Sequence, residues 1–223
     1  MNVRFSASAS AALLALLLTG CSGQGAGTGA PTSSAGTSAA TSSAAAPTSA
    51  VAKPGEPWFD DVKVAESGGK VSSACQLPVD FEVGKLWVAK TVAESTSTVM
   101  GKQGDFLVAC EVDAKPAGNL GFLRVWTSKS TLDASKALEN FMTGEKKATK
   151  PEIRTTAAGP LAAAEVSYKL PDPINGGERF QRALAVSTPK GAVILHLGGI
   201  DTDEHKQMLA AYVLARSSLT AKG

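Results

Sequence analysis

The chain is poor in histidine, in aromatic residues and in net charge. Its 223 residues include two histidines, aromatic side chains make up 5%, and 22 basic residues nearly balance 20 acidic ones. A near-neutral balance provides no basic footprint for a nucleic-acid backbone, so we expect no nucleic-acid partner. The sequence also lacks H-E-x-x-H and G-x-x-x-x-G-K-[ST], the motifs of zinc peptidases and phosphate-binding loops. These absences favour a protein that is not an enzyme and has no cofactor.

Long apolar runs are missing as well, apart from a short one near the start. A run of about ten apolar residues ends at Leu18, whereas a helix that spans a bilayer takes about 20. Arg4 precedes this run and small residues follow it, which is typical of an export signal. We therefore expect residues 1–20 to be a signal peptide.

The apolar run ends in Leu18-Thr19-Gly20-Cys21. This stretch resembles the lipobox of bacterial lipoproteins, with Leu18 at the apolar position, Gly20 before the cut and Cys21 as the acceptor. The resemblance implies cleavage after Gly20 and a diacylglyceryl group, with acyl chains such as palmitate, on the Cys21 thiol. The protein would then be lipid-anchored on the extracytoplasmic face of the cell membrane. The alternative is a secreted protein whose cysteine happens to lie near the cut.

Residues 21–57 consist mostly of Ser, Thr, Ala, Gly and Pro. Such a stretch cannot bury enough apolar area to offset the entropy lost on ordering, so we expect a disordered linker. At about 5–6 Å times the square root of the length, roughly 35 residues have a mean reach near 30 Å. Some hydroxyl side chains are candidate O-glycosylation acceptors, the alternative being an unmodified spacer: Thr28, Thr32, Ser33, Thr37 and Thr41.

The other two cysteines, Cys75 and Cys110, would lie in an oxidising compartment, where disulfides persist. We predict a bridge between them, which should contribute about 3–4 kcal/mol in the chain-entropy model. The alternative is a reactive or metal-binding pair. That reading lacks both the C-x-x-C spacing and a histidine close by in the sequence.

Residues 58–223 are long enough for a single globular domain. The apolar periodicity predicts amphipathic helices over 131–143, with Ser130 or Thr131 as the cap, and over 202–219, with a capping box formed by Asp201 and Glu204. A period of two predicts strands over 77–83, 86–92, 106–112, 120–127, 153–156, 162–169, 180–186 and 193–197. This order predicts an α+β fold, a mostly antiparallel sheet with helices packed on it.

The order of these elements resembles the Mog1/PsbP-like α/β/α sandwich, to which actinobacterial lipoproteins of the LpqN type are similar. The helix over 131–143, the hairpin over 180–197 and the helix over 202–219 carry the resemblance. It implies an accessory or binding protein without catalysis. The Cys75 and Cys110 pair is an addition that the resemblance does not imply.

The densest group of possible metal ligands follows the last predicted strand and consists of Asp201, Asp203, Glu204 and His205. Carboxylate oxygens and an imidazole could hold a divalent cation. Acidic side chains are equally what the positive end of a helix favours. We therefore predict no metal site and regard these four residues as weak candidates.

The remaining polar and aromatic candidates favour structural roles. His196 alternates with Leu195 and Leu197, so we expect it on the opposite face of its strand, packed with Ile194 rather than acting in a Ser-His-Asp site. Two tryptophans and three lysines are left: we expect Trp87 and Trp126 in the core, and Lys146, Lys147 and Lys150 on a solvated loop, the alternative for the lysines being contact with anionic wall polymers.

Taken together, the sequence predicts a membrane-anchored envelope lipoprotein that acts as a non-catalytic binding or accessory module. We expect a monomer whose partner is an envelope protein or a cell-wall component. One alternative is a carrier of an apolar small molecule or lipid held between sheet and helix. A more distant alternative is an envelope hydrolase that uses His196.

Overall fold

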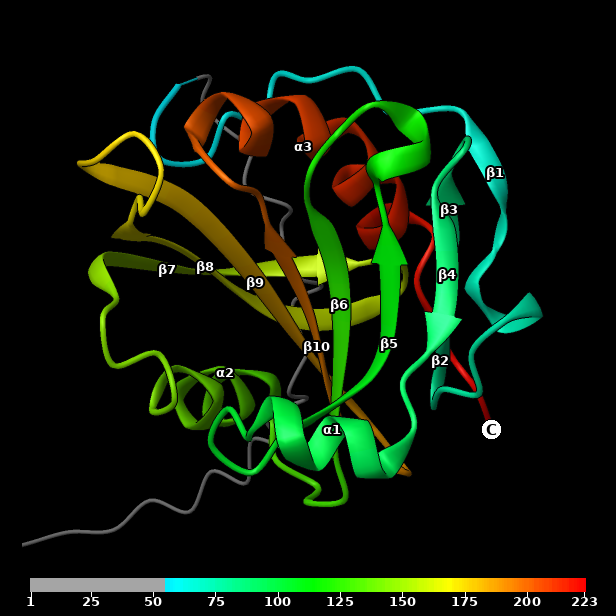
Figure 1. Ribbon diagram of the computed structural model, residues 1–223. Helices are drawn as coiled ribbons and strands as arrows, with labels where there is room; N and C mark the ends of the chain where they lie inside the picture. Colours follow the sequence, from blue (N-terminus) through cyan, green and yellow to red (C-terminus); the bar gives the residue numbers. More distant parts are fainter. Residues whose placement is uncertain (1–54) are drawn as a thin grey trace, which may run out of the picture. The chain divides into compact units, whose positions relative to one another are not determined.

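Figure 1 shows a computed structural model of the chain, in which residues 55–223 are described. The predicted signal peptide, Cys21 and nearly all of the predicted linker lie outside the described residues. The main sheet has seven strands, each antiparallel to its neighbours. In spatial order they are β4 (Val88–Thr91), β5 (Leu107–Asp113), β6 (Phe122–Ser128), β10 (Gly191–Gly198), β9 (Glu178–Thr188), β8 (Leu161–Pro171) and β7 (Thr149–Ala158).

Shorter elements complete the described part of the chain. Two small antiparallel sheets pair β1 (Ser67–Lys70) with β3 (Glu82–Gly84), and β2 (Val79–Asp80) with β11 (Thr220–Ala221). The helices are α1 (Glu94–Met100), α2 (Ala134–Met142) and α3 (Thr202–Ser217), together with the 3-10 turns η1 (Val71–Ser73) and η2 (Lys115–Ala117).

The two faces of the main sheet have separate cores, because successive side chains of a strand point to opposite faces. On one face, Leu195 and Leu197 of β10 pack with Met208 and Tyr212 of α3. On the other face, Ile194 of β10 packs with residues of α2. The fold is therefore α+β, with a mostly antiparallel sheet and helices packed on it, as the sequence predicted.

The hairpin between β9 and β10 shows how local sequence sets the register. Gly191 has a φ of 118°, and a Cβ at this position would lie 2.0 Å from the carbonyl oxygen of Ser128. Only glycine fits a left-handed position with so little space. The turn therefore confirms the predicted hairpin, in which His196 lies opposite Ala183 of β9. The separate pairing of β10 with β6 places His196 opposite Arg124.

Asp201 caps α3, because its carboxylate accepts a hydrogen bond from the Glu204 amide at 2.8 Å. The reciprocal half of the predicted box differs, since the Glu204 carboxylate accepts from the amide of Leu120 at 2.8 Å. The predicted caps of the earlier helix were wrong. Asp133 caps α2 by accepting from the amide of Lys136, so that helix begins at Ala134.

One predicted strand needed correction, and one helix was missed. The strand predicted over 77–83 is divided into β2 and β3, which pair with different partners, although Val79, Phe81 and Val83 are all buried as the alternation indicated. Helix α1 was not predicted, and its Val99 is 88% exposed. This helix has only seven residues and no apolar residues at helical spacing, so hydrophobic periodicity could not indicate it.

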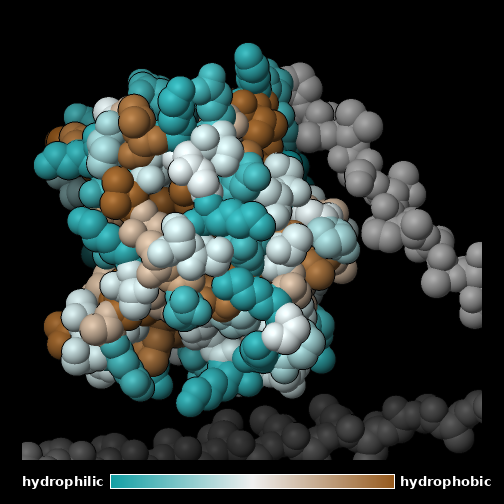
Figure 2. Space-filling view, turned by 90° about the vertical axis from the view of Figure 1, so that its right-hand side faces the viewer, coloured by the Kyte–Doolittle hydropathy of each residue, from teal (hydrophilic) through white to brown (hydrophobic). Residues whose placement is uncertain are grey.

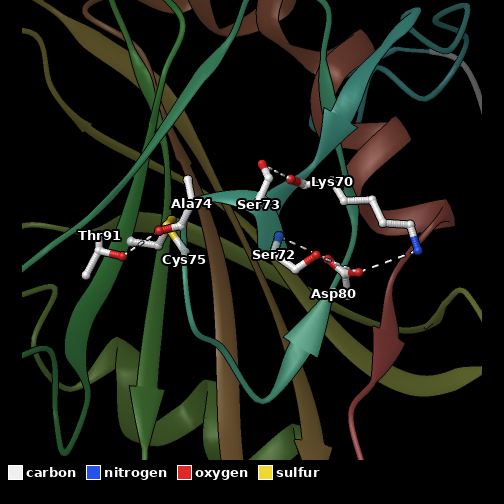
Figure 3. Close-up of a disulfide and its surroundings, with 8 residues drawn as sticks. Lys70, Ser72, Ser73, Ala74, Cys75, Asp80 and Thr91 are labelled. Carbon is white, nitrogen blue, oxygen red and sulfur yellow. Dashed lines mark hydrogen bonds and ion pairs between the residues drawn. A yellow bond between two sulfur atoms is a disulfide. The ribbon is translucent and has the colours of Figure 1, made fainter.

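A disulfide joins Cys75, which follows η1, to Cys110 of β5, with the two Cα atoms 6.0 Å apart. Figure 3 shows the surroundings of this bond: Thr91 of β4 donates to the carbonyl of Ala74 at 2.8 Å, and Asp80 accepts from the amide and hydroxyl of Ser72. The bridge and these bonds fix the irregular segment before β2 against the edge of the main sheet.

The surface on the side of β1, β3 and β4 is mostly hydrophilic (Figure 2), and the apolar side chains seen there form small separate areas. The exposed large apolar residues of this region include Val64, Leu86 and Val88. Isolated apolar side chains are normal on a protein surface. This face therefore gives no indication of a broad apolar docking surface.

Candidate functional site

Helix α2 covers only part of its sheet face. Phe141 of α2 packs edge-on against Trp126 and against His196, with ring centroids 5.8 and 5.6 Å apart. Figure 1 shows α2 across the lower part of this face, with the upper ends of the central strands extending beyond it. We call the surface beyond α2 the open face; it is formed by Phe122, Arg124, Arg179, Gln181, His196 and Gly198.

A pocket of about 170 Å³ lies on the open face. We call it the arginine pocket, because Arg124 of β6 and Arg179 of β9 both line it, together with His196 and Gly198 of β10. The strand register explains this grouping, since Arg124 lies opposite His196 and Gly198 lies opposite Gln181. Two guanidinium groups and an imidazole thus converge on one small concavity.

His196 is held in one orientation by its neighbours. Its Nε2 atom lies 3.0 Å from the hydroxyl of Tyr168 on β8, a diagonal contact across β9, where Ala183 lies opposite His196 and Gln181 lies opposite Tyr168. Burial, reinforced by the positive charges of Arg124 and Arg179, lowers the pKa of His196 to about 3. The ring is therefore neutral at physiological pH, and its buried Nδ1 atom has no hydrogen-bond partner among the described residues.

Arg179 connects the arginine pocket to a second cavity. Its Nη1 donates to the carbonyls of Gly199 and Ile200 at 2.8 and 3.3 Å, while its buried Nε has no partner in the described part of the chain. The second cavity measures about 440 Å³ and is also lined by Lys146, Lys147 and one acidic residue, Glu145. We call it the lysine groove; both lysines are exposed on the loop where the sequence placed them.

The opposite sheet face contains a larger charged group, the ion network. Its members are two carboxylates and three guanidiniums: Asp60, Glu165, Arg154, Arg182 and Arg216. Glu165 accepts from Arg182 at 2.8 Å, from Arg154 at 2.6 Å and from the hydroxyl of Tyr212 at 2.5 Å. Both carboxylates are almost fully buried, with side chains 2% and 0% exposed.

The ion network is internally paired and therefore structural. Burial alone would raise the pKa of Glu165, but the charges and hydrogen bonds of its arginines outweigh burial and lower it. The same balance lowers the pKa of Asp60. Arg182 also donates to the carbonyl of Trp58 at 2.6 Å, so the network holds the segment before β1 against the sheet. Sequence reasoning missed it, because single charges on strands look like solvent-facing positions.

A third cavity of about 730 Å³ lies beside α1. Its lining mixes basic Lys129 and Lys190 with acidic Glu94 and Asp105, and it includes the buried Ser97 hydroxyl, which has no partner among the described residues. Mixed charge gives this cleft no clear ligand class. The arginine pocket is the better candidate, because its basic groups converge and two of its buried polar atoms are unpartnered.

The predicted metal candidates serve other roles. Asp201 caps α3, Glu204 accepts from Leu120, Asp203 lies 3.9 Å from Lys206, and His205 is buried beside Phe180. Within residues 55–223, no group of three or more possible ligands has metal-binding geometry. The four side chains therefore do not converge on one point.

Other predicted residues lie where the sequence indicated. Trp87 and Trp126 belong to the two cores, and His196 faces the same side as Ile194. Lys150 differs from the prediction, because it lies within β7 and pairs with Glu178 at 2.8 Å. The partner of His196 is Tyr168 rather than a serine.

Comparison with known proteins identifies the family. A family model described as "uncharacterised lipoprotein" matches residues 43–219. The chain belongs to this lipoprotein family. The match extends from the predicted linker to the second residue after α3, so it includes both sheet faces. No curated protein matches the chain.

Among solved structures, the solution structure of cyanobacterial PsbP (CyanoP) from Synechocystis sp. PCC 6803 is similar to the structure of this lipoprotein. The sequences are 13% identical, the TM-score is 0.43, and the similarity covers 65% of this chain and 87% of the other. In the described part of the lipoprotein, no helix is both long and apolar enough to cross a membrane.

Proposed function

We propose that this lipoprotein is anchored through Cys21 on the extracytoplasmic face of the membrane and acts there as a non-catalytic binding module. The open face is its binding surface. The observation that carries the proposal is the convergence of Arg124, Arg179 and His196 in a pocket that α2 leaves uncovered. Membership of a lipoprotein family supports the anchor.

The carrier alternative has less support. A carrier would hold an apolar molecule between sheet and helix. In the described structure, Leu195, Met208 and Tyr212 pack together between α3 and the sheet, and the ion network lies beside them. Between α2 and the sheet, Phe141, Ile194 and Trp126 likewise form a packed core. Both interlayer spaces are thus filled by the chain's own side chains.

The anchor predicts a change of location on substitution of one residue. We expect Cys21→Ser to move the chain from the membrane fraction to the soluble fraction, because one thiol would accept the lipid and two or more acyl chains hold a protein firmly. Ser22→Ala is the matched control and should leave the chain in the membrane fraction. Unchanged membrane partition of the Cys21→Ser chain would contradict the anchor.

The binding role predicts position-dependent crosslinking in living cells. We expect a photo-crosslinking residue in place of Lys147, beside the open face, to give a discrete crosslinked product. The same residue in place of Lys85, an exposed residue between β3 and β4, should give none. Equal products from both positions would contradict a role for the open face.

The non-catalytic assignment has its own test. Turnover of an envelope substrate by the purified chain, if that turnover is lost in His196→Ala, would contradict it.

A further inference from the structure

Arg179 is the cation on the open face whose charge is least neutralised. Within residues 55–223 it forms no ion pair, and its contacts are with backbone carbonyls. Arg124 differs, because its Nε donates to Glu111 at 2.7 Å and its guanidinium lies over the ring of Phe122. Glu145 and Asp172 lie near enough to feel the charge of Arg179 but form no ion pair with it. The positive charge of Arg179 is therefore weakened by these carboxylates from a distance but is not neutralised by an ion pair among the described residues.

The unpartnered atoms of the pocket are hydrogen-bond donors or can become donors. The buried Nε–H of Arg179 is a hydrogen-bond donor. Nδ1 of His196 also carries one in the tautomer in which Tyr168 donates to Nε2. A Cβ on Gly198 would lie 4.0 Å from Cε1 of His196, so the imidazole ring lies beside a residue that lines the pocket.

Leaving buried polar groups without partners is unfavourable, because each has lost its hydrogen bonds to water. His196 is 7% exposed, so solvent gives it little compensation. A ligand that accepts hydrogen bonds would recover this free energy, and a negatively charged acceptor would recover more of it. Cations are disfavoured by the two guanidiniums, and an apolar group would leave the donors unpaired.

The size of the pocket limits what enters it. About 170 Å³ is smaller than the roughly 300–1,000 Å³ of sites that enclose a drug-sized ligand. The pocket can therefore hold one small charged group. Because Arg179 also lines the lysine groove, the rest of a larger ligand would extend past this side chain toward Lys146 and Lys147.

We propose that the arginine pocket binds an oxyanion group, a phosphate or a carboxylate, through the guanidinium of Arg179 and the imidazole of His196. Arg124, which is already paired with Glu111, lines the opposite wall, and the lysine groove accommodates the remainder of an anionic ligand. The inference rests on the proposed binding function and adds the chemical class of the ligand.

Titration of the full chain, purified in a non-ionic detergent, tests this assignment. The probes are inorganic phosphate, acetate and dioctanoyl phosphatidylglycerol below its micellar concentration, and the readout is the 15N resonances of the arginine Nε and histidine ring nitrogens. We expect saturable shifts at Arg179 and His196, with a dissociation constant of about 1 mM for the best small anion, because only a few charge-assisted bonds form.

Variants separate the specific site from general charge. Arg179→Gln should weaken binding at least about tenfold, which corresponds to about 1.4 kcal/mol. Lys129→Gln removes the same charge beside the α1 cleft and should leave binding unchanged. Gly198→Ala keeps every charge but adds a methyl group 2.9 Å from Oε1 of Gln181, and it should also weaken binding. Arg179→Lys keeps the positive charge at this position, and the backbone amide spectrum of each variant is compared with that of the parent chain to verify that the fold is unchanged.

The arms of the titration separate the sources of the oxyanion. Tighter, Arg179-dependent binding of the phosphatidylglycerol assigns the pocket to lipid headgroups, and equal binding of inorganic phosphate assigns it to soluble phosphates. Preference for acetate assigns it to carboxylates. Absence of saturable shifts with all three probes, or equal losses in Arg179→Gln and Lys129→Gln, would overturn the proposal. If position-dependent crosslinks persist in that case, the binding role stands and only the oxyanion assignment fails.

Discussion

Glu165→Gln is expected to lower the free energy of unfolding by about 3–5 kcal/mol, because it breaks a buried ion pair and leaves charges without compensation. Glu165 is fully buried and accepts from Arg154, Arg182 and Tyr212. In the variant, the neutral amide leaves Asp60 as the only carboxylate paired with the three guanidiniums of the network. Urea denaturation with the disulfide intact measures the loss.

Glu111→Gln is the matched control for this prediction. Glu111 also lies on a strand and also pairs with an arginine, but its side chain is 25% exposed and has Arg124 as its single ionic partner. We expect a loss of about 1 kcal/mol or less, as for other solvent-accessible ion pairs. Equal losses in the two variants would show that burial of the network contributes nothing.

A double variant tests whether the loss comes from uncompensated charge. Arg182→Met added to Glu165→Gln removes the guanidinium that is most buried beside the missing carboxylate. The second substitution should then cost less than it does in the parent chain, because coupled residues are not additive. Additive losses would mean that the two side chains stabilise the fold independently.

The second large effect is a loss of stability on mild acidification. The pKa of His196 and that of His205 are each about 3 in the folded chain, mainly because of burial, against an ordinary value of 6.5. The unfolded chain therefore binds these protons more readily, and stability falls as the pH drops below 6.5. Each histidine costs about 1.4 kcal/mol per pH unit, so the two remove about 4 kcal/mol between pH 7.5 and 5.

Other titrating groups modify this window in known directions. The lowered pKa values of Asp60 and Glu165 make their contribution disappear only at more acidic pH, in the range of ordinary carboxylates. Burial raises the pKa of Glu145, so acidification favours the folded state at this side chain and partly offsets the histidines. The contribution of Glu145 is the same in the parent chain and in the histidine variants, so it cancels when their pH dependences of stability are compared.

His205→Leu isolates one histidine. His205 is 1% exposed and neither ring nitrogen has a partner among the described residues, so leucine should fit and should also be tolerated at neutral pH. We expect the loss between pH 7.5 and 5 to fall by about 2 kcal/mol relative to the parent chain, measured by urea denaturation at each pH. Gln207→Leu, on the exposed side of the same helix, should leave the pH dependence unchanged. An unchanged slope in His205→Leu would refute the buried-histidine explanation.

Local patterns were sufficient for several features of the fold. The alternation over 180–197 and the glycine at 191 predicted the hairpin, and Asp201 predicted the start of α3. The pairing of Cys75 with Cys110 followed from the number of cysteines left for an oxidising compartment. Such features depend on residues close in sequence or on a count, so they can be derived without knowing the arrangement of the chain.

The candidate site could be predicted only in part. The sequence indicated that His196 would lie on the face opposite Leu195, and the structure confirms this. It did not indicate that Arg124 and Arg179, which are 55 positions apart, would reach the same pocket. That meeting depends on β10 joining β6 to β9, a long-range pairing that no local period encodes.

The residue patterns alone indicate an α+β domain of alternating strands and two amphipathic helices, and they predict an export signal and a lipobox-like cysteine before it. Which charged strand residues are buried and which are open depends on long-range packing. Glu165 and Arg182 are charged residues within strands that otherwise contain many apolar residues, and the same is true of Arg124 and Arg179. The first pair is buried because α3 and the segment of Asp60 close over it, whereas the second borders a face that α2 leaves uncovered.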